Sequence, residues 1–188
     1  GPKQGKFITQ RDRGCEKLAL VETFPPVHGV YHFTTHDERS VLPVGREDLS
    51  EYEGSVRVWK DACPALDAGD KAAEWFSEYL GVSCRLVKRH PDYQRQTDLE
   101  FSRPGDYTAF ADGFPVLITN AASLDKLSEH FSSSAEGANK ISMDRFRPNI
   151  VVSGLDPFEE DTIRRLLIGN VEFELVKPCS RCEITTID

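Results

Sequence analysis

The chain has 188 residues, of which 39% are hydrophobic and 29% are charged, an ordinary composition for a folded protein. This length can bury a substantial core and form one domain or two small ones. The formal net charge of -8 argues against broad binding of nucleic-acid polymers, because such binding needs Lys and Arg to displace counterions from phosphates. The five cysteines are too few and too scattered for a disulfide scaffold, so we expect a reducing compartment, the cytoplasm.

No apolar run approaches the length needed to cross a bilayer, so we expect no membrane span in this sequence. No charged-then-apolar leader opens it either. The first residues, GPKQGKFITQR, include no Met, and we expect some natural N-terminal sequence to be missing.

The first third of the chain has the residue pattern of β-strands. Runs rich in β-branched and aromatic residues stand between turn-forming segments at residues 6–11, 17–24 and 55–59. Residues 29–44 are typical of a hairpin, with the charged sequence HDERS at its tip.

Helical periodicity begins at residue 67 and ends near Gly81, which stands where a helix would stop. The apolar positions at this spacing are Ala72, Trp75, Phe76, Tyr79 and Leu80. We expect a strand at residues 84–89. The polar stretch 90–106 is a long connection and a candidate domain seam.

The second half of the chain alternates between strands and helices. Asn120 is a good N-cap for a helix over residues 121–131, which follows an apolar strand at 116–119. Further elements are expected as a strand at 149–154, a turn with a short helix over 156–169, and a strand at 171–178. The whole pattern predicts a strand-rich α+β fold.

The last two cysteines, Cys179 and Cys182, admit several interpretations. A structural zinc site normally needs four ligands, and one CxxC supplies two. A redox pair normally opens a helix, whereas the following residues EITTID favour a continued strand. Both cysteines could be small buried apolar residues. The remaining interpretation is one functional thiolate, which Arg181 supports because a neighbouring cation favours the thiolate form.

A second cluster is MDRFRPNIVVSG, at residues 143–154. In an extended segment Arg145 and Arg147 would point to the same side, and Pro148 discourages helix before it. Arginine forks suit phosphate and carboxylate oxygens, and Asn149 offers both a donor and an acceptor to a heterocycle. The alternative is that the arginines pair with nearby carboxylates or lie solvated.

Together, FRPNIVVSG and LIGNVEFELVKPCSRCEITTID resemble the MOSC-domain family, in the branch of the bacterial N-hydroxylated-compound reductases and the mitochondrial amidoxime-reducing component. GKFITQR, VRVWKDACPALDAGDKAAEWFSEYLG and YTAFADGFPVLITNAASLDKL are similar to earlier parts of the family, so the resemblance covers essentially the whole chain. It implies an N-terminal MOSC β-barrel-like module at residues 1–88 and a β-barrel-type MOSC catalytic domain at 89–188. Residues 1–11 could instead belong with the catalytic domain.

The family binds a molybdenum cofactor, Mo-molybdopterin, and the resemblance implies a set of site residues. Cys182 is expected to be the catalytic thiolate on molybdenum, a metal that accepts soft sulfur ligands, and Cys179 a neighbour that is not a ligand. The positions that match cofactor contacts are Arg11, Asp112, Gly113, Phe114, Arg147, Asn149, Ser180 and Arg181. For Arg11 and Asp112 the alternatives are a surface arginine and a turn residue. Pyridoxal phosphate binding is also implied at the family level.

The sequence departs from the family at both ends. The family opens with a Lys-Ser type element that contacts the cofactor, and its chain continues well beyond the cysteine motif. Neither part is present here, so we expect the catalytic domain to be truncated at its C-terminus. A ferredoxin-like domain found in some bacterial members is also absent, which implies an external electron donor such as a flavoprotein reductase, a ferredoxin or a cytochrome.

The resemblance implies an oxidoreductase that reduces small N-hydroxylated compounds, such as amidoximes, hydroxylamines or N-hydroxylated nucleobases. One alternative is a carrier of the cofactor or its sulfur, of the MOSC sulfurase type, with a persulfide on Cys182 or Cys179. Another is an inactive binding module. A reductase consumes its substrate and needs an electron donor, whereas a carrier does neither.

Overall fold

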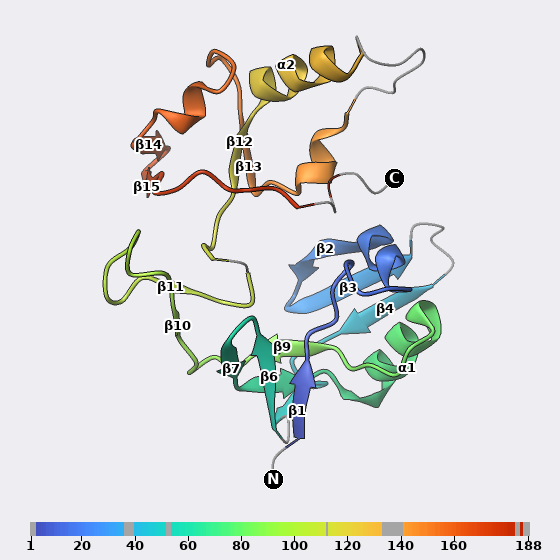
Figure 1. Cartoon of the computed structure of the whole chain (residues 1–188). Coiled ribbons are helices and arrows are strands. Elements are labelled where there is room, and N and C mark those ends of the chain that lie inside the picture. Colours follow the sequence, from blue (N-terminus) through green and yellow to red (C-terminus); the bar gives the residue numbers. More distant parts are fainter. Residues whose placement is uncertain are drawn as a thin grey trace. The chain divides into compact units, whose positions relative to one another are not determined.

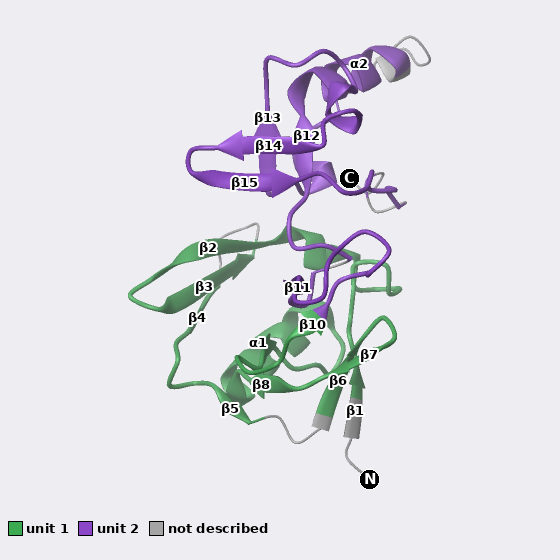
Figure 2. Ribbon diagram, turned by 90° about the vertical axis from the view of Figure 1, so that its left-hand side faces the viewer, with its two compact units in different colours: residues 1–95 green, residues 96–188 purple. Residues whose placement is uncertain are grey.

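The computed structural model describes residues 3–35, 40–51, 54–111, 113–132, 141–182 and 185. The chain divides into two compact units, Gly1–Arg95 and Gln96–Asp188, which Figure 2 shows in separate colours. The structure is 22% helical and 32% strand, which confirms the strand-rich α+β class. The domain boundary between residues 88 and 89 stays a prediction. No helix within the described ranges is long and apolar enough to cross a membrane.

The first unit contains three sheets of three strands each. In one sheet, β1 (Lys3–Lys6) pairs in parallel with β6 (Gly54–Val58), and β7 (Asp61–Cys63) pairs antiparallel with β6. A second sheet is the antiparallel series β2 (Val21–Val27), β3 (Val30–Thr35) and β4 (Val41–Val44). The third has the order β5 (Ser50–Glu51), β8 (Ala65–Asp67) and β9 (Val87–Arg89). Among the described strands no sheet closes into a barrel.

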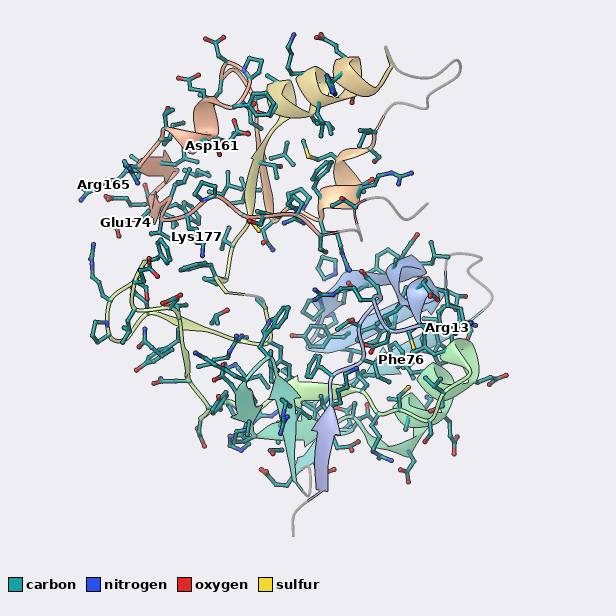
Figure 3. The ribbon with its side chains drawn as sticks, in the orientation of Figure 1. Arg13, Phe76, Asp161, Arg165, Glu174 and Lys177 are labelled. Carbon is teal, nitrogen blue, oxygen red and sulfur yellow. The ribbon has the colours of Figure 1, made fainter. Side chains whose placement is uncertain are left out.

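The core of the first unit forms where helix α1 (Gly69–Leu80) packs on β4. Phe76 points from α1 into this core, where its ring meets Phe33 edge-on at a centroid distance of 5.7 Å (Figure 3). The helix ends at Gly81, whose φ of 75° lies in the left-handed region that glycine adopts without steric cost. The predicted helix and its stop are therefore confirmed.

The second unit is built around a short parallel pair, β12 (Ile118–Asn120) with β13 (Ile150–Val152) (Figure 1). Helix α2 (Ala121–Ser132) follows β12 directly. The remaining pairs are β14 (Arg165–Ile168) with β15 (Val171–Glu174), and β11 (Tyr107–Thr108) with β10 (Arg95–Gln96), which spans the division between the units. Single 3-10 turns are η1 (Glu16–Leu20), η2 (Met143–Phe146) and η3 (Glu159–Asp161).

Several predicted elements have different bounds or types. The strand expected at residues 6–11 is wrong, because β1 ends at Lys6 and the chain turns at Asp12, whose carboxylate accepts the Thr9 N–H at 2.8 Å. The segment 17–24 begins as η1 before β2 starts. The helix expected within 156–169 is only η3, because pairing with β15 draws the apolar residues of β14 into a strand. The hairpin over 29–44 is confirmed, and its tip, residues 36–39, lies outside the described residues.

Asn120 caps α2 as predicted and also holds the turn around η3. Its Oδ1 accepts the Ala122 N–H at 3.1 Å. Its Nδ2 donates to the Asp156 carbonyl at 2.8 Å and to Glu160 Oε2 at 2.9 Å. With 1% of its surface exposed, Asn120 ties the end of β12 to the segment that follows β13.

Replacing Asn120 by Ala should lower the free energy of unfolding by about 2 kcal/mol, because the change removes a helix cap and the donor to the Asp156 carbonyl and Glu160. Urea unfolding followed by circular dichroism measures this. Asn170→Ala, at an exposed turn position, is the control and should change the value by less than about 0.5 kcal/mol. Equal effects of the two substitutions would contradict the role assigned to Asn120.

Candidate functional site

The cysteine segment Cys179–Cys182 follows β15 in irregular conformation, and both thiols are free and exposed. The interpretation of the pair as small buried apolar residues is therefore wrong. The continued strand expected after Cys182 is also not seen at Thr185, whose N–H and Oγ1 both donate to the Cys182 carbonyl, at 3.2 and 3.0 Å. The remaining residues 183–184 and 186–188 lie outside the described residues.

Arg181 joins the cysteine segment to the 3-10 turn η2. Its Nη1 donates to Cys179 Sγ at 3.1 Å, and its Nη2 donates to the Phe146 carbonyl at 2.8 Å. Because Cys182 follows Arg181 and Arg147 follows Phe146, this guanidinium brings the two sequence motifs together in the second unit. Cys179 is therefore more than an adjacent residue, since its sulfur is the acceptor for one arm of that link.

Arg147 ends η2 in a left-handed conformation, with φ 50° and ψ 51°, and its N–H donates to the Asp144 carbonyl at 2.9 Å. Pro148 disfavours the right-handed helical conformation for Arg147, so the 3-10 turn does not continue past this residue. The extended segment expected for Arg145 and Arg147 is thus wrong, and strand alternation does not place their side chains on one side. The Arg147 side chain is exposed and has no hydrogen-bond or ion-pair partner among the described residues.

Arg145 has a different environment from Arg147. It is half-buried, and its Nη1 lies 3.5 Å from the Thr185 carbonyl, so it contacts the chain just after Cys182. Of the two arginines, Arg147 is the one whose guanidinium is available to an anion.

Asn149 has a structural role that the motif did not reveal. Its Oδ1 accepts the Leu117 N–H at 2.8 Å, and its own N–H donates to the Leu117 carbonyl at 2.9 Å. These two bonds extend the parallel pairing of β12 and β13 by one step. The Nδ2 group has no partner in the described part of the chain and can donate to a ligand.

The other predicted cofactor contacts are less closely tied to the cysteine segment. Ser180 and Gly113 are exposed, Phe114 is half-buried, and Gly113 and Phe114 lie in the irregular segment before β12. Asp112 lies outside the described residues. Arg11 belongs to the first unit, where its guanidinium carbon stands 5.1 Å from the ring centroid of Trp59. The cofactor roles of these residues stay predictions.

The donor set suits a metal that brings its own ligands better than a bare ion. Within the described ranges no three His, Cys, Asp or Glu residues come together. A single exposed thiol, however, is the one protein ligand that a dithiolene-bound molybdenum would need, and sulfur is a donor this metal accepts. Arg147 and the Nδ2 of Asn149 supply a cation and a donor without partners among the described residues, in the segment that Arg181 links to the cysteines.

An open hollow of about 410 Å³ lies beside the β14–β15 hairpin, between residues 100–103 and 174–176. Its charges are largely satisfied. Arg103 donates to Glu174 Oε1 at 2.6 Å, and Arg165 lies 3.5 Å from Glu172 and 4.0 Å from Glu174 (Figure 3). Among the described residues, this hollow therefore offers a ligand fewer unpaired charged groups than the segments around Arg147 and Cys182.

The fold and the linked motifs define a strand-rich α+β protein with two exposed cysteines in the segment that Arg181 joins to η2. The chain matches the family described as "MOSC N-terminal beta barrel domain" over residues 2–83 and the family described as "MOSC domain" over residues 106–188. It belongs to the MOSC-domain family, as the sequence motifs implied.

Known members with similar sequences have two kinds of name. The chain is 40% identical over 190 residues to human "Mitochondrial amidoxime reducing component 2", covering 99% of this chain and 54% of that protein. It is 36% identical over 126 residues to mouse "Mitochondrial amidoxime-reducing component 1", covering 65% and 35%. A "Molybdenum cofactor sulfurase" of Caenorhabditis briggsae is 34% identical over 160 residues, covering 84% and 20%. The chain thus spans about half the length of the human relative and less of the other two.

Two contacts of the site have no signal in the sequence. The Phe146 carbonyl is an acceptor for Arg181, and backbone acceptors cannot be recognised from residue type. Trp59, which stacks with Arg11, was part of an expected strand and gave no reason to expect an arginine partner.

Substitutions can distinguish the structural role of the Asn149 amide oxygen from the role of its nitrogen. Asn149→Asp keeps an oxygen for the Leu117 N–H and removes the free Nδ2 donor, whereas Asn149→Ala removes both. We expect the free energy of unfolding to fall by about 1 kcal/mol in Asn149→Ala and to stay within about 0.5 kcal/mol of wild type in Asn149→Asp. Urea unfolding and hydrogen exchange at the Leu117 amide measure these effects. Equal destabilisation by both changes would contradict the assigned bond.

Proposed function

We propose that this chain is the part of a molybdenum-cofactor-dependent oxidoreductase that holds the cofactor and reduces N-hydroxylated compounds. The observation that carries the proposal is the Arg181 link, which joins the exposed Cys182 segment to the turn that ends at Arg147. Family membership and the names of the human and mouse relatives support the same reaction class.

Each residue of the linked segments has a role in this proposal. Cys182 would bind molybdenum through its sulfur, and Arg147 would bind the cofactor phosphate with its unpaired guanidinium. The Asn149 Nδ2 would donate to an acceptor of the pterin ring, while Arg181 keeps the thiol segment against η2. When bound, the molybdenum centre supplies the chemistry that removes oxygen from nitrogen.

The balanced reaction sets what the rest of the system must provide. An N-hydroxylated compound takes up two electrons and two protons and yields the reduced nitrogen compound and water. The electrons would come from an external donor, and the proposal includes a flavoprotein reductase, a ferredoxin or a cytochrome in that role. The substrate class comprises amidoximes, hydroxylamines and N-hydroxylated nucleobases. A cytoplasmic location remains the prediction for this chain, and two relatives carry the word mitochondrial in their names.

A second candidate function is a carrier of the cofactor or of its sulfur. It is favoured by the hydrogen bond from Arg181 to Cys179 Sγ, because a cation beside a sulfur stabilises the anionic persulfide that such a carrier would hold. The similarity to the Caenorhabditis briggsae sulfurase supports it as well.

Elemental mass spectrometry of the chain from a host that makes molybdopterin tests the thiol assignment. We expect near-stoichiometric molybdenum in wild type, loss of at least about tenfold in Cys182→Ser, and retention in Cys179→Ser, where the hydroxyl oxygen can still accept from Arg181. Equal loss in both variants, or zinc in place of molybdenum, would contradict the assignment.

The molybdenum-containing protein should then turn over benzamidoxime with reduced methyl viologen. A persulfide on either cysteine without turnover would favour the carrier.

Arg147→Gln tests the assigned phosphate contact. Because Arg147 has no partner in the described residues, the free energy of unfolding should change by less than about 0.5 kcal/mol. Molybdenum content should nevertheless fall severalfold, since a charge-assisted contact to phosphate is lost. The matched control is Arg164→Gln, another exposed arginine of the second unit with no described partner, which should retain its metal. Unchanged content in Arg147→Gln would remove this residue from the site.

A further inference from the structure

A parallel strand pair brings Trp59 and Arg11 together in the first unit. Strand β1 pairs with β6 in the register Lys6 to Arg57, so both strands leave the sheet at the same edge (Figure 1). Trp59 comes two residues after Arg57, and Arg11 comes five residues after Lys6. The guanidinium carbon of Arg11 lies 5.1 Å from the centroid of the Trp59 ring, within the range of a cation–π contact.

The backbone at Trp59 is strained. The residue opens the two-residue turn between β6 and β7, with a φ of 56° in the left-handed region. A bulky side chain is rare there and costs roughly 1–2 kcal/mol, whereas Gly or Asn would make the same turn without that cost. The indole is nevertheless 58% exposed, so the strain is not offset by burial of the ring. A strained and exposed aromatic residue of this kind points to a binding role.

Arg11 is held in place by its own turn. Its N–H donates to Thr9 Oγ1 at 3.2 Å, and the carboxylate of Asp12 accepts from the Thr9 N–H at 2.8 Å and from Lys6 Nζ at 2.6 Å. The hydrogen bond from Lys6, followed by that from the Thr9 backbone, lowers the pKa of Asp12. The carboxylate therefore stays ionised near neutral pH and keeps the turn closed, which limits the conformations of Arg11.

More than half of the Trp59 surface is open to solvent beside the Arg11 contact. Arg11 lies over the ring, and no second ring or cation is placed against it in the described structure. Lys60, the next residue in the turn, is also exposed. A free indole face suits a planar heteroaromatic ring, and each stacked base contributes about 1–3 kcal/mol in proteins that bind nucleic acids this way. The Arg11 guanidinium beside the indole suits a phosphate or a ring carbonyl.

We propose that Trp59 and Arg11 form a stacking site for a nucleobase carried by a small molecule: a free base, a nucleoside or a nucleotide. The net charge of -8 favours such a monomer over a polymer, whose many phosphates the chain would repel. The site lies wholly within the first unit and concerns binding alone. It therefore stands independently of the proposed reduction, although N-hydroxylated nucleobases belong to the class of ligands it takes.

Fluorescence titration of the full chain tests the site, because the chain has only two tryptophans, Trp59 and Trp75. Cytidine monophosphate, N4-hydroxycytidine and a pterin carboxylate are the probes. We expect saturable quenching by the two cytidine compounds in wild type and in Trp75→Phe, where Trp59 is the sole indole. Isothermal titration should show affinity at least about fivefold weaker in Trp59→Leu, the lower limit expected for the loss of one stacked base. Arg11→Gln should weaken it severalfold.

Tyr31 and Lys88 provide a matched control. Lys88 Nζ also lies 5.1 Å from the ring centroid of its partner, and Tyr31 is exposed, but the backbone of this pair is not strained. Tyr31→Leu should leave the affinity unchanged, and an equal loss in this variant would overturn the proposal. Absence of saturable quenching in wild type would also overturn it, whether or not the variants fold. Binding of the pterin without binding of either cytidine compound would reject a nucleobase site and identify a cofactor contact.

Discussion

Short parallel strand pairs are the constraint on which both candidate sites depend. Parallel strands cannot be joined by a tight turn, so each pair brings together segments that are distant in the sequence. In the first unit β1 pairs with β6, and in the second unit β12 pairs with β13. Arg147 and Asn149 stand just before β13, and Trp59 stands just after β6. Loss of either pairing would separate the residues of the corresponding site.

In the second unit the position of the cysteine segment depends, through η2, on the pairing of β12 with β13. Asn149 extends the pairing through its amide, and Arg147 ends η2 in a left-handed conformation directly before Pro148. The Phe146 carbonyl of that turn anchors Arg181. The cysteine segment is attached mainly through this arginine and a small number of other hydrogen bonds, and its residues are exposed. A segment with few buried contacts opens at low free energy, so a ligand bound to the thiol and to Arg147 would also order the segment.

The sequence patterns correctly predicted the elements whose structure depends on residues close together in the chain. The helix α1 with its glycine stop, the hairpin of β3 and β4, and the Asn120 cap all follow from side-chain spacing and backbone preference within a few residues. The errors arose where tertiary pairing or backbone conformation decided the outcome. Pairing with β15 made β14 a strand where helix was expected, and a left-handed residue replaced the extended chain before Pro148.

The candidate site could be predicted only in part from the sequence, again because distant segments determine its geometry. The motifs identified the residue types and the family, because thiol, guanidinium and amide chemistry can be read from the sequence alone. The exposure of Cys179, the structural use of the Asn149 oxygen and the strain at Trp59 depend on contacts between distant segments, or on φ, and no motif encodes them. The parallel pairings that create these contacts are themselves not specified by any local periodicity.

The three arginines expected at the cofactor differ in a way that assigns them separate roles. Arg181 uses both of its Nη groups within the protein, on Cys179 and Phe146, and Arg11 lies against Trp59. A guanidinium that is already committed to protein groups loses part of those contacts when it turns to a ligand, which offsets the gain. Arg147 has no such contact among the described residues and can give its full donor set to an anion. In the proposed site the phosphate contact is therefore assigned to Arg147, while Arg181 links the thiol segment to η2 and Arg11 contacts the indole.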